Sequence, residues 1–117
     1  MLNHMVQYRA STVNRVAAAI SDPTRRAIID RLARGPARIC DVAAPFAMSL
    51  SGFCKHVRVL ERAKLVRRSR RGRENTLELS PEPMRAVAHW ILQYEQFWNA
   101  RVDRLEKFFA GEKEPWR

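Results

Sequence analysis

The hydrophobic pattern of this sequence changes its period at Ala63. From Ser49 to Ala63, apolar residues recur every three or four positions, which predicts a helix whose buried face consists of Phe53, Val57 and Leu60. Beyond Ala63, the segments LVRRSRR and RENTLELS are separated by Gly72 and predict two strands joined by a tight turn. A chain of 117 residues has room for about one domain, so the helix and the hairpin should belong to the same small fold.

Positive charge is concentrated on the same helix and hairpin. The chain carries 22 Lys and Arg residues against 12 Asp and Glu, a formal net charge of +10. Nine of the basic residues lie between Lys55 and Arg73, where the one acid is Glu61. A solvated helix face would mix the two signs. This basic block therefore predicts a polyanionic partner, and nucleic acid is the commonest one.

The aromatic residues are segregated from the basic block. The last third of the chain holds Trp90, Tyr94, Phe97, Trp98, Phe108 and Phe109. Proteins that stack single-stranded bases interleave aromatic and basic side chains, so the separation favours double-stranded DNA. The charge leaves an alternative open, in which the chain is a module that binds an anionic membrane surface or acts as a protein scaffold through the aromatic segment. Because no apolar run is long enough to span a membrane and the first residues lack a signal-peptide core, we expect a cytoplasmic protein.

Three shorter helices are expected before the basic one. Val13, Val16, Ala17 and Ile20 predict a first helix over residues 12–20, after an N-terminal arm of residues 1–11. The pair Asp22-Pro23 predicts the start of a second helix, which ends at Gly35-Pro36. Its buried residues should be Ala27, Ile28, Ile29 and Leu32. A third helix, limited by Pro45, should bury Ile39, Val42, Ala43 and Phe46.

The basic helix has the start signals of the second helix in a helix-turn-helix. Ser49 is a favourable N-cap, and Met48 and Phe53 have the spacing of a hydrophobic staple. The face opposite the apolar one consists of Ser51, Lys55, Arg58 and Arg62. Two short helices joined by the tight AMS turn predict a helix-turn-helix, and the hairpin after it is a basic wing.

A long last helix is expected after Pro81 and Pro83. Its apolar stripe consists of Met84, Val87, Ile91, Tyr94, Trp98, Val102, Leu105 and Phe108. The stripe would extend for about 40 Å at about 1.5 Å per residue. A domain of this size has a radius of gyration of only about 13 to 14 Å, so a second copy of the chain should cover the stripe.

The order of these motifs resembles the ArsR/SmtB family of winged helix-turn-helix transcriptional regulators. SDPTRR, MSxxxxxKHxxxLExAxLV and RRGR occur in order at the separations of that family. The resemblance covers residues 12–110, which form the DNA-binding and dimerisation domain, and leaves residues 111–117 as a tail. It implies a homodimer built from the first and last helices, recognition helices in successive major grooves of a palindromic operator, and wings on flanking phosphates or in the minor groove.

The expected site residues follow from the helix, the wing and the resemblance. On the recognition helix they are Ser51, Gly52, Lys55, His56, Arg58 and Arg62. On the wing they are Arg68, Arg70, Arg71 and Arg73. The expected dimer interface consists of Val13, Val16, Ile20, Ile91, Tyr94, Trp98, Val102 and Leu105.

The metal-binding motifs of that family are not present in this sequence. Metal-sensing members carry a CVCD-type run, whereas RICD keeps Cys40 and has Arg38 in place of the other cysteine. The last helix offers His89 without a second histidine. Because a thiolate metal site needs three or four converging donors, we expect no metal and no cofactor. Cys40 and Cys54 are then plain thiols, with a redox switch through Cys54 as the alternative.

The sequence therefore predicts a mainly α fold with a small β-hairpin, about five helices and a two-stranded wing. No phosphate loop, nucleophile elbow or metalloprotease motif is present, so we expect no enzyme. The expected function is that of a homodimeric, sequence-specific regulator, most simply a repressor, on a palindromic operator in double-stranded DNA. A nonspecific nucleic-acid or nucleoid protein is the alternative. The operator, the regulated genes and any effector are left open.

Overall fold

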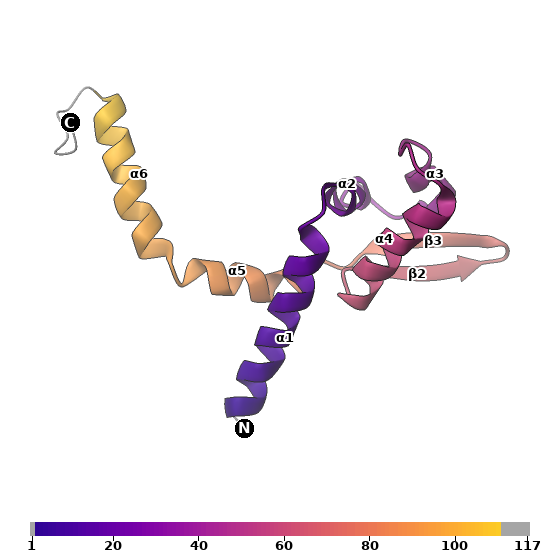
Figure 1. The fold of residues 1–117 in the computed structure, drawn as a ribbon, viewed down its shortest axis with the longest axis horizontal. Helices are drawn as coiled ribbons and strands as arrows, with labels where there is room; N and C mark the ends of the chain where they lie inside the picture. Colours follow the sequence, from indigo (N-terminus) through magenta and orange to yellow (C-terminus); the bar gives the residue numbers. More distant parts are fainter. Residues whose placement is uncertain (1, 111–117) are drawn as a thin grey trace. The chain divides into compact units, whose positions relative to one another are not determined.

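The computed structural model describes residues 2–110 of the chain. Its elements follow the order α1 (Leu2–Ile20), α2 (Pro23–Leu32), β1 (Ala37–Arg38), α3 (Ile39–Ala43), α4 (Leu50–Arg62), β2 (Val66–Arg71), β3 (Glu74–Leu79), α5 (Met84–Leu92) and α6 (Glu95–Phe109) (Figure 1). Two compact units divide the chain between Val87 and Ala88. The expectation of one domain over residues 12–110 differs from this division, which lies within α5.

A mainly α winged helix-turn-helix is confirmed, with more elements than expected. The predicted two-stranded wing is part of a three-stranded antiparallel sheet in the order β1-β3-β2. In β1, Ala37 pairs with Leu77 and Arg38 pairs with Thr76. A strand of two residues is too short to show an alternating pattern, so the sequence offers no sign of it.

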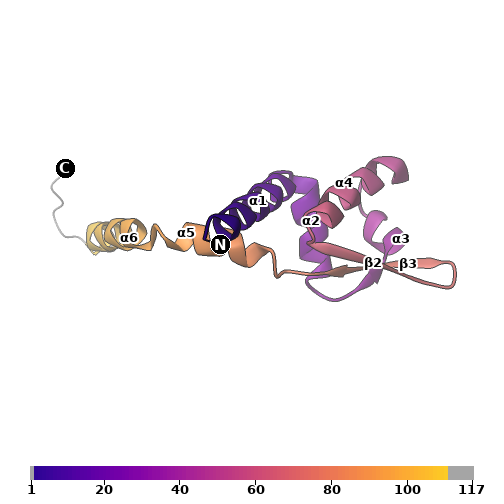
Figure 2. The same cartoon turned by 90° about the horizontal axis from the view of Figure 1, so that it is seen from below.

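The wing formed by β2 and β3 extends beyond α3 and α4 and ends in a two-residue turn (Figure 2). Arg71 pairs with Glu74, which leaves Gly72 and Arg73 to make the turn. Gly72 has a φ of +62°. Two-residue hairpins of type II′ require a positive φ at their first turn position, where glycine has no steric cost.

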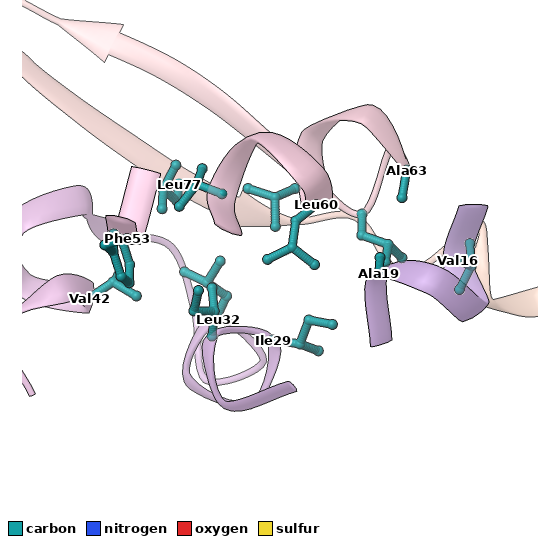
Figure 3. Packing of buried hydrophobic residues seen from close by; sticks show 13 residues of the cluster. Val16, Ala19, Ile29, Leu32, Val42, Phe53, Leu60, Ala63 and Leu77 are labelled. Atoms are coloured by element: carbon teal, nitrogen blue, oxygen red, sulfur yellow. The ribbon is translucent and has the colours of Figure 1, made fainter. Parts of the chain in front are cut away.

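The core lies between the helices of the first unit and the sheet. Phe53, Val57 and Leu60 of α4 are fully buried, as predicted. Phe53 and Val42 lie together at one end of the cluster, and Val16 and Ala19 of α1 lie at the other (Figure 3). In α2, Ile28, Ile29 and Leu32 are buried, whereas Ala27 is exposed and that prediction was wrong.

The expected bounds of the first helix were also wrong. α1 begins at Leu2 and not at Thr12, so residues 2–11 of the expected arm are helical. This stretch contains neither proline nor glycine, and nothing in its sequence therefore stops the helix from extending toward its N-terminus.

The expected last helix is interrupted at Gln93 and Tyr94. Here the backbone hydrogen bonds join residues three positions apart instead of four. Gln93 N donates to Trp90 O at 3.3 Å, and Tyr94 N donates to Ile91 O at 3.0 Å. The prediction of one continuous helix was wrong, because a tight turn of this kind can occur without the proline or glycine that marks helix ends in a sequence.

Helix α4 ends in a backbone motif that sets the start of the wing. Leu65 N donates to Leu60 O and Lys64 N donates to Glu61 O, both at 3.0 Å. These are the two bonds of a Schellman motif, and they require a left-handed residue after the helix. Lys64 takes that position with a φ of 63°. The chain therefore turns sharply from α4 into β2, and Leu60 and Leu65 are both fully buried.

Candidate nucleic-acid interface

The N-terminus of α4 is held by the predicted cap. Gly52 N donates to Ser49 Oγ at 3.1 Å. A Cβ added at Gly52 would lie 3.3 Å from the same Oγ, so a side chain here would crowd the cap. The apolar contact at this end comes from Phe46, whose ring centroid lies 5.5 Å from that of Phe53. Met48, the expected partner of Phe53, is 38% exposed.

The outer face of α4 is polar and exposed, as predicted. Ser51, Lys55, Arg58 and Arg62 are all exposed, on the side opposite the buried Phe53 and Val57. Within residues 10–110, whose side chains the structure describes, the side chains of Lys55, Arg58 and Arg62 make no hydrogen bond or ion pair. Unneutralised cations on one helix face can donate to phosphate oxygens or to the O6 and N7 acceptors of guanine.

His56 is half-buried and, unlike these cations, contacts side chains of another helix. Its side chain is 25% exposed, and its Nδ1 atom is 3.2 Å from Arg25 Nη1 and 3.8 Å from Asp22 Oδ2. Both partners belong to the start of α2. One edge of the ring therefore faces α2, and His56 is the one predicted recognition residue that joins α4 to another helix.

The corner between α1 and α2 is built by the SDPTRR segment. Asp22 caps α2, because its Oδ2 accepts a hydrogen bond from Arg25 N at 3.0 Å. Arg25 Nε donates to Ala19 O at 2.7 Å, and Arg26 Nη1 donates to Ile20 O at 2.7 Å. The two arginines thus satisfy carbonyl groups at the end of α1 that have no partner within the helix.

The four predicted wing arginines are divided between the two faces of the sheet and the turn. Arg68 pairs with Leu77 and Arg70 pairs with Asn75, so both lie on the sheet face that also carries the buried Val66. Arg71 pairs with Glu74 on the opposite face, because neighbouring residues of a strand alternate. Arg73 lies in the turn.

Two of these arginines have partners within the protein. Arg68 Nη2 donates to Glu61 Oε1 at 3.0 Å, which links the wing to α4. Arg70 Nε donates to Gly72 O at 3.1 Å and supports the turn. In the described part of the chain, Arg71 and Arg73 make no side-chain hydrogen bond or ion pair.

A second group of ion pairs holds the wing, and the sequence did not predict it. Arg38 donates to Asp41 Oδ2 at 2.8 Å and to Glu74 Oε1 at 3.0 Å. The hydrogen bond that Arg38 donates to Asp41 first, and the one that it donates to Glu74 next, hold the pKa of Arg38 above its ordinary value. Arg38 therefore joins β1, α3 and the wing turn. The RICD motif places Arg38 beside Asp41, but nothing local to either residue points to Glu74.

The expected dimer residues divide into buried and exposed groups. Val16 is fully buried in the core of its own chain and Ile20 packs against that core, so assigning Val16 to a dimer surface was wrong. Val13 and Ile91 are half-buried. Tyr94, Trp98, Val102 and Leu105 are each 43–51% exposed.

Neither cysteine lies in a metal cluster within the part of the chain that the structure describes. Cys40 is exposed and Cys54 is half-buried. Among the side chains that the structure describes, those of residues 10–110, no three His, Cys, Asp or Glu groups come together to hold a metal ion. None of the helices in that range is both long and apolar enough to cross a membrane.

The chain is similar to known transcriptional regulators. A helix-turn-helix domain family matches residues 20–69. The chain is 32% identical to the transcriptional repressor SdpR of Bacillus subtilis, over 70% of this chain and 91% of that protein. It is also 32% identical to the HTH-type transcriptional regulator Rv2034 of Mycobacterium tuberculosis, over 92% of this chain and 96% of that protein.

Solved structures share the fold. A crystal structure of an ArsR family transcriptional regulator is 38% identical and has a TM-score of 0.71, covering 77% of this chain and 93% of the other. A homodimeric winged helix-turn-helix DNA-binding domain from Mycobacterium bovis has a TM-score of 0.59 at 22% identity, covering 75% of this chain and 83% of the other. That second likeness concerns the fold alone.

Proposed function

Because the chain belongs to the ArsR family of winged helix-turn-helix transcriptional regulators, we propose that it is a homodimeric repressor of a palindromic DNA operator. The observation that carries this proposal is the outer face of α4. Lys55, Arg58 and Arg62 are exposed there and have no carboxylate partner among the described residues. A helix fits the major groove of B-DNA, where such donors can read base edges.

We assign different tasks to the residues of this face. Lys55 and Arg58, near the middle of α4, would donate to guanine acceptors and adjacent phosphates. Ser51 would add a less selective hydrogen bond, and Gly52 would allow a close approach of the backbone. Arg62, at the C-terminal end, would contact a phosphate and help to set the register of the helix.

The wing would add contacts that position the protein. The side chains of Arg71 and Arg73 have no hydrogen-bond or ion-pair partner within residues 10–110, and both residues lie at or beside the turn. Such residues would contact phosphates or enter a narrow minor groove. Arg70 is one residue before this pair, and Arg68 can share its guanidinium between Glu61 and DNA because it has five donors.

A second copy of the chain is the proposed partner of the apolar residues on α6. Trp98, Val102 and Leu105 recur at helical spacing and are 46–51% exposed. Burying this stripe against its symmetry mate would remove apolar surface from water. A two-fold dimer carries two recognition helices, so its operator should have two half-sites about one helical turn apart, centre to centre.

Selection of bound duplexes from a random pool tests the proposal. We expect a two-fold symmetric consensus for the wild-type protein and its loss when Lys55 and Arg58 are both changed to alanine. A flat affinity across sequences would favour the nonspecific nucleic-acid or nucleoid protein. An enriched sequence without symmetry would contradict the dimer while leaving specific binding intact.

A further inference from the structure

Arg25 connects three helices through a single side chain. Its Nε donates to Ala19 O at 2.7 Å and its Nη2 donates to Ala18 O at 3.0 Å, at the end of α1. Its Nη1 lies 3.2 Å from Nδ1 of His56 on α4. Arg25 itself belongs to the first turn of α2.

The chemistry of this contact determines which nitrogen of His56 carries the proton. A guanidinium has five donors and no acceptor, so Nδ1 must accept the hydrogen bond. A neutral imidazole that accepts at Nδ1 carries its proton on Nε2. The Nε2–H group is then a donor directed away from Arg25, and the ring remains 25% exposed.

We propose that Arg25 is a positioning residue for DNA recognition, which holds His56 in the Nε2–H tautomer so that the recognition helix presents one further donor. This proposal rests on the proposed function of α4. The acceptor would be a phosphate oxygen or a base edge in DNA, since both accept hydrogen bonds from N–H groups.

Asp22 supplies the competing arrangement. Its Oδ2 lies 3.8 Å from His56 Nδ1, beyond a direct hydrogen bond, and accepts from the backbone N–H of Arg25. Without the Arg25 guanidinium, His56 could move its proton to Nδ1 and donate to this carboxylate. Nε2 would then carry a lone pair and repel a phosphate oxygen.

Long-range proton–nitrogen NMR spectra of the DNA-free protein at neutral pH test the tautomer directly. We expect Nε2–H for His56 in the wild type and a shift toward Nδ1–H in Arg25→Ala. Arg26→Ala is the matched control, because Arg26 also donates to the end of α1 but its hydrogen bond goes to Ile20 O. It should leave the His56 signals unchanged. A wild-type ring protonated at Nδ1 would overturn the proposal.

Binding to a selected duplex then tests whether Arg25 acts through His56. Arg25→Ala should weaken binding of the dimer by about tenfold to a hundredfold, the effect of about one lost hydrogen bond in each protomer. The slope of log affinity against log salt should stay unchanged. In a His56→Gln background, where the side-chain amide can replace the Nε2–H donor, the same change should have no further effect. An equal loss in both backgrounds, or a shallower slope, would contradict action through His56.

Two controls keep these results separable. If Arg25→Ala does not fold, Arg25→Met replaces it with the same expectations, since methionine keeps an unbranched side chain but has no hydrogen-bond donor for His56. If the wild type prefers no duplex, the proposed function fails. The NMR result would in that case still decide whether Arg25 controls the tautomer of His56.

Discussion

Lys64 has a strained backbone conformation at the sharp turn between α4 and β2. Its φ of 63° lies in the left-handed region, which side chains with a Cβ disfavour by about 1 to 2 kcal/mol. Lys64→Gly should therefore raise the free energy of unfolding by about 0.5 to 1 kcal/mol, after the greater freedom of glycine in the unfolded chain is subtracted. Denaturant titration measures this change in the free energy of unfolding. Lys64→Ala, which removes the charge but keeps the Cβ, should show no such gain.

Asp22 links the stability of the α1–α2 corner to pH. The hydrogen bond from Arg25 N, together with the positive charge of the Arg25 side chain, lowers the pKa of Asp22 from its ordinary 3.8. A lowered pKa in the folded state adds stability that is fully present above 3.8 and is lost as the pH falls through the folded pKa. Asn also caps helices but does not ionise. Asp22→Asn should thus cost stability at pH 7, and thermal unfolding should show that difference disappearing in acid.

Lys55 tests base readout at a single position. Lys55→Ala should weaken binding by about 1 to 3 kcal/mol for each lost base contact and relax the preference at one position of each half-site. Lys64→Ala removes the same charge just beyond the end of α4 and should leave the base preference as it is. Binding to duplexes with single substitutions measures both variants. An unchanged preference in Lys55→Ala would remove Lys55 from the readout.

At the scale of elements, the wing can be tested through the salt dependence of binding. Replacing Arg70, Arg71 and Arg73 with alanine removes about six cations from a dimer, and each neutralised phosphate contributes about 0.9 to the slope of log affinity against log salt. The slope should become shallower by about five. Specific and nonspecific duplexes should weaken alike, because phosphate contacts carry no sequence information.

Titrations from about 50 to 200 mM salt measure this change. A variant lacking Arg31, Arg34 and Arg85, which lie outside the wing and outside α4, removes the same charge and should keep more of the slope. If the two variants behaved alike, the wing would contribute only its general charge. A lost preference at the outer operator positions would show that the wing reads the shape of the minor groove.

At the scale of the whole molecule, the exposed stripe of α6 predicts the assembly state. Trp98→Asp should produce monomers, because a charge in a buried apolar interface costs several kcal/mol unless it reaches water. Asn99→Asp adds the same charge at the neighbouring exposed position and should leave the dimer intact. Sedimentation equilibrium measures both. Dimers that persist in Trp98→Asp would place the interface elsewhere.

The sequence alone determined the position of α4 and of the wing in this protein. Ser49 capped α4 as predicted, Phe53, Val57 and Leu60 were buried, and Lys55, Arg58 and Arg62 were exposed. These features are local, because a cap, a helical period and a glycine turn depend on residues a few positions apart. They were sufficient to predict the fold class and the face proposed to meet DNA.

Tertiary structure decided how the elements are tied together. Arg25 meets His56 from 31 positions away, and Arg38 meets Glu74 from 36 positions away. It also placed Val16 in the core of its own chain, where the helical period alone could not separate a core face from a dimer face. Apolar spacing indicates which face of a helix will be buried, but packing decides what covers that face. Polar side chains find distant partners only once the helices and the sheet are in contact.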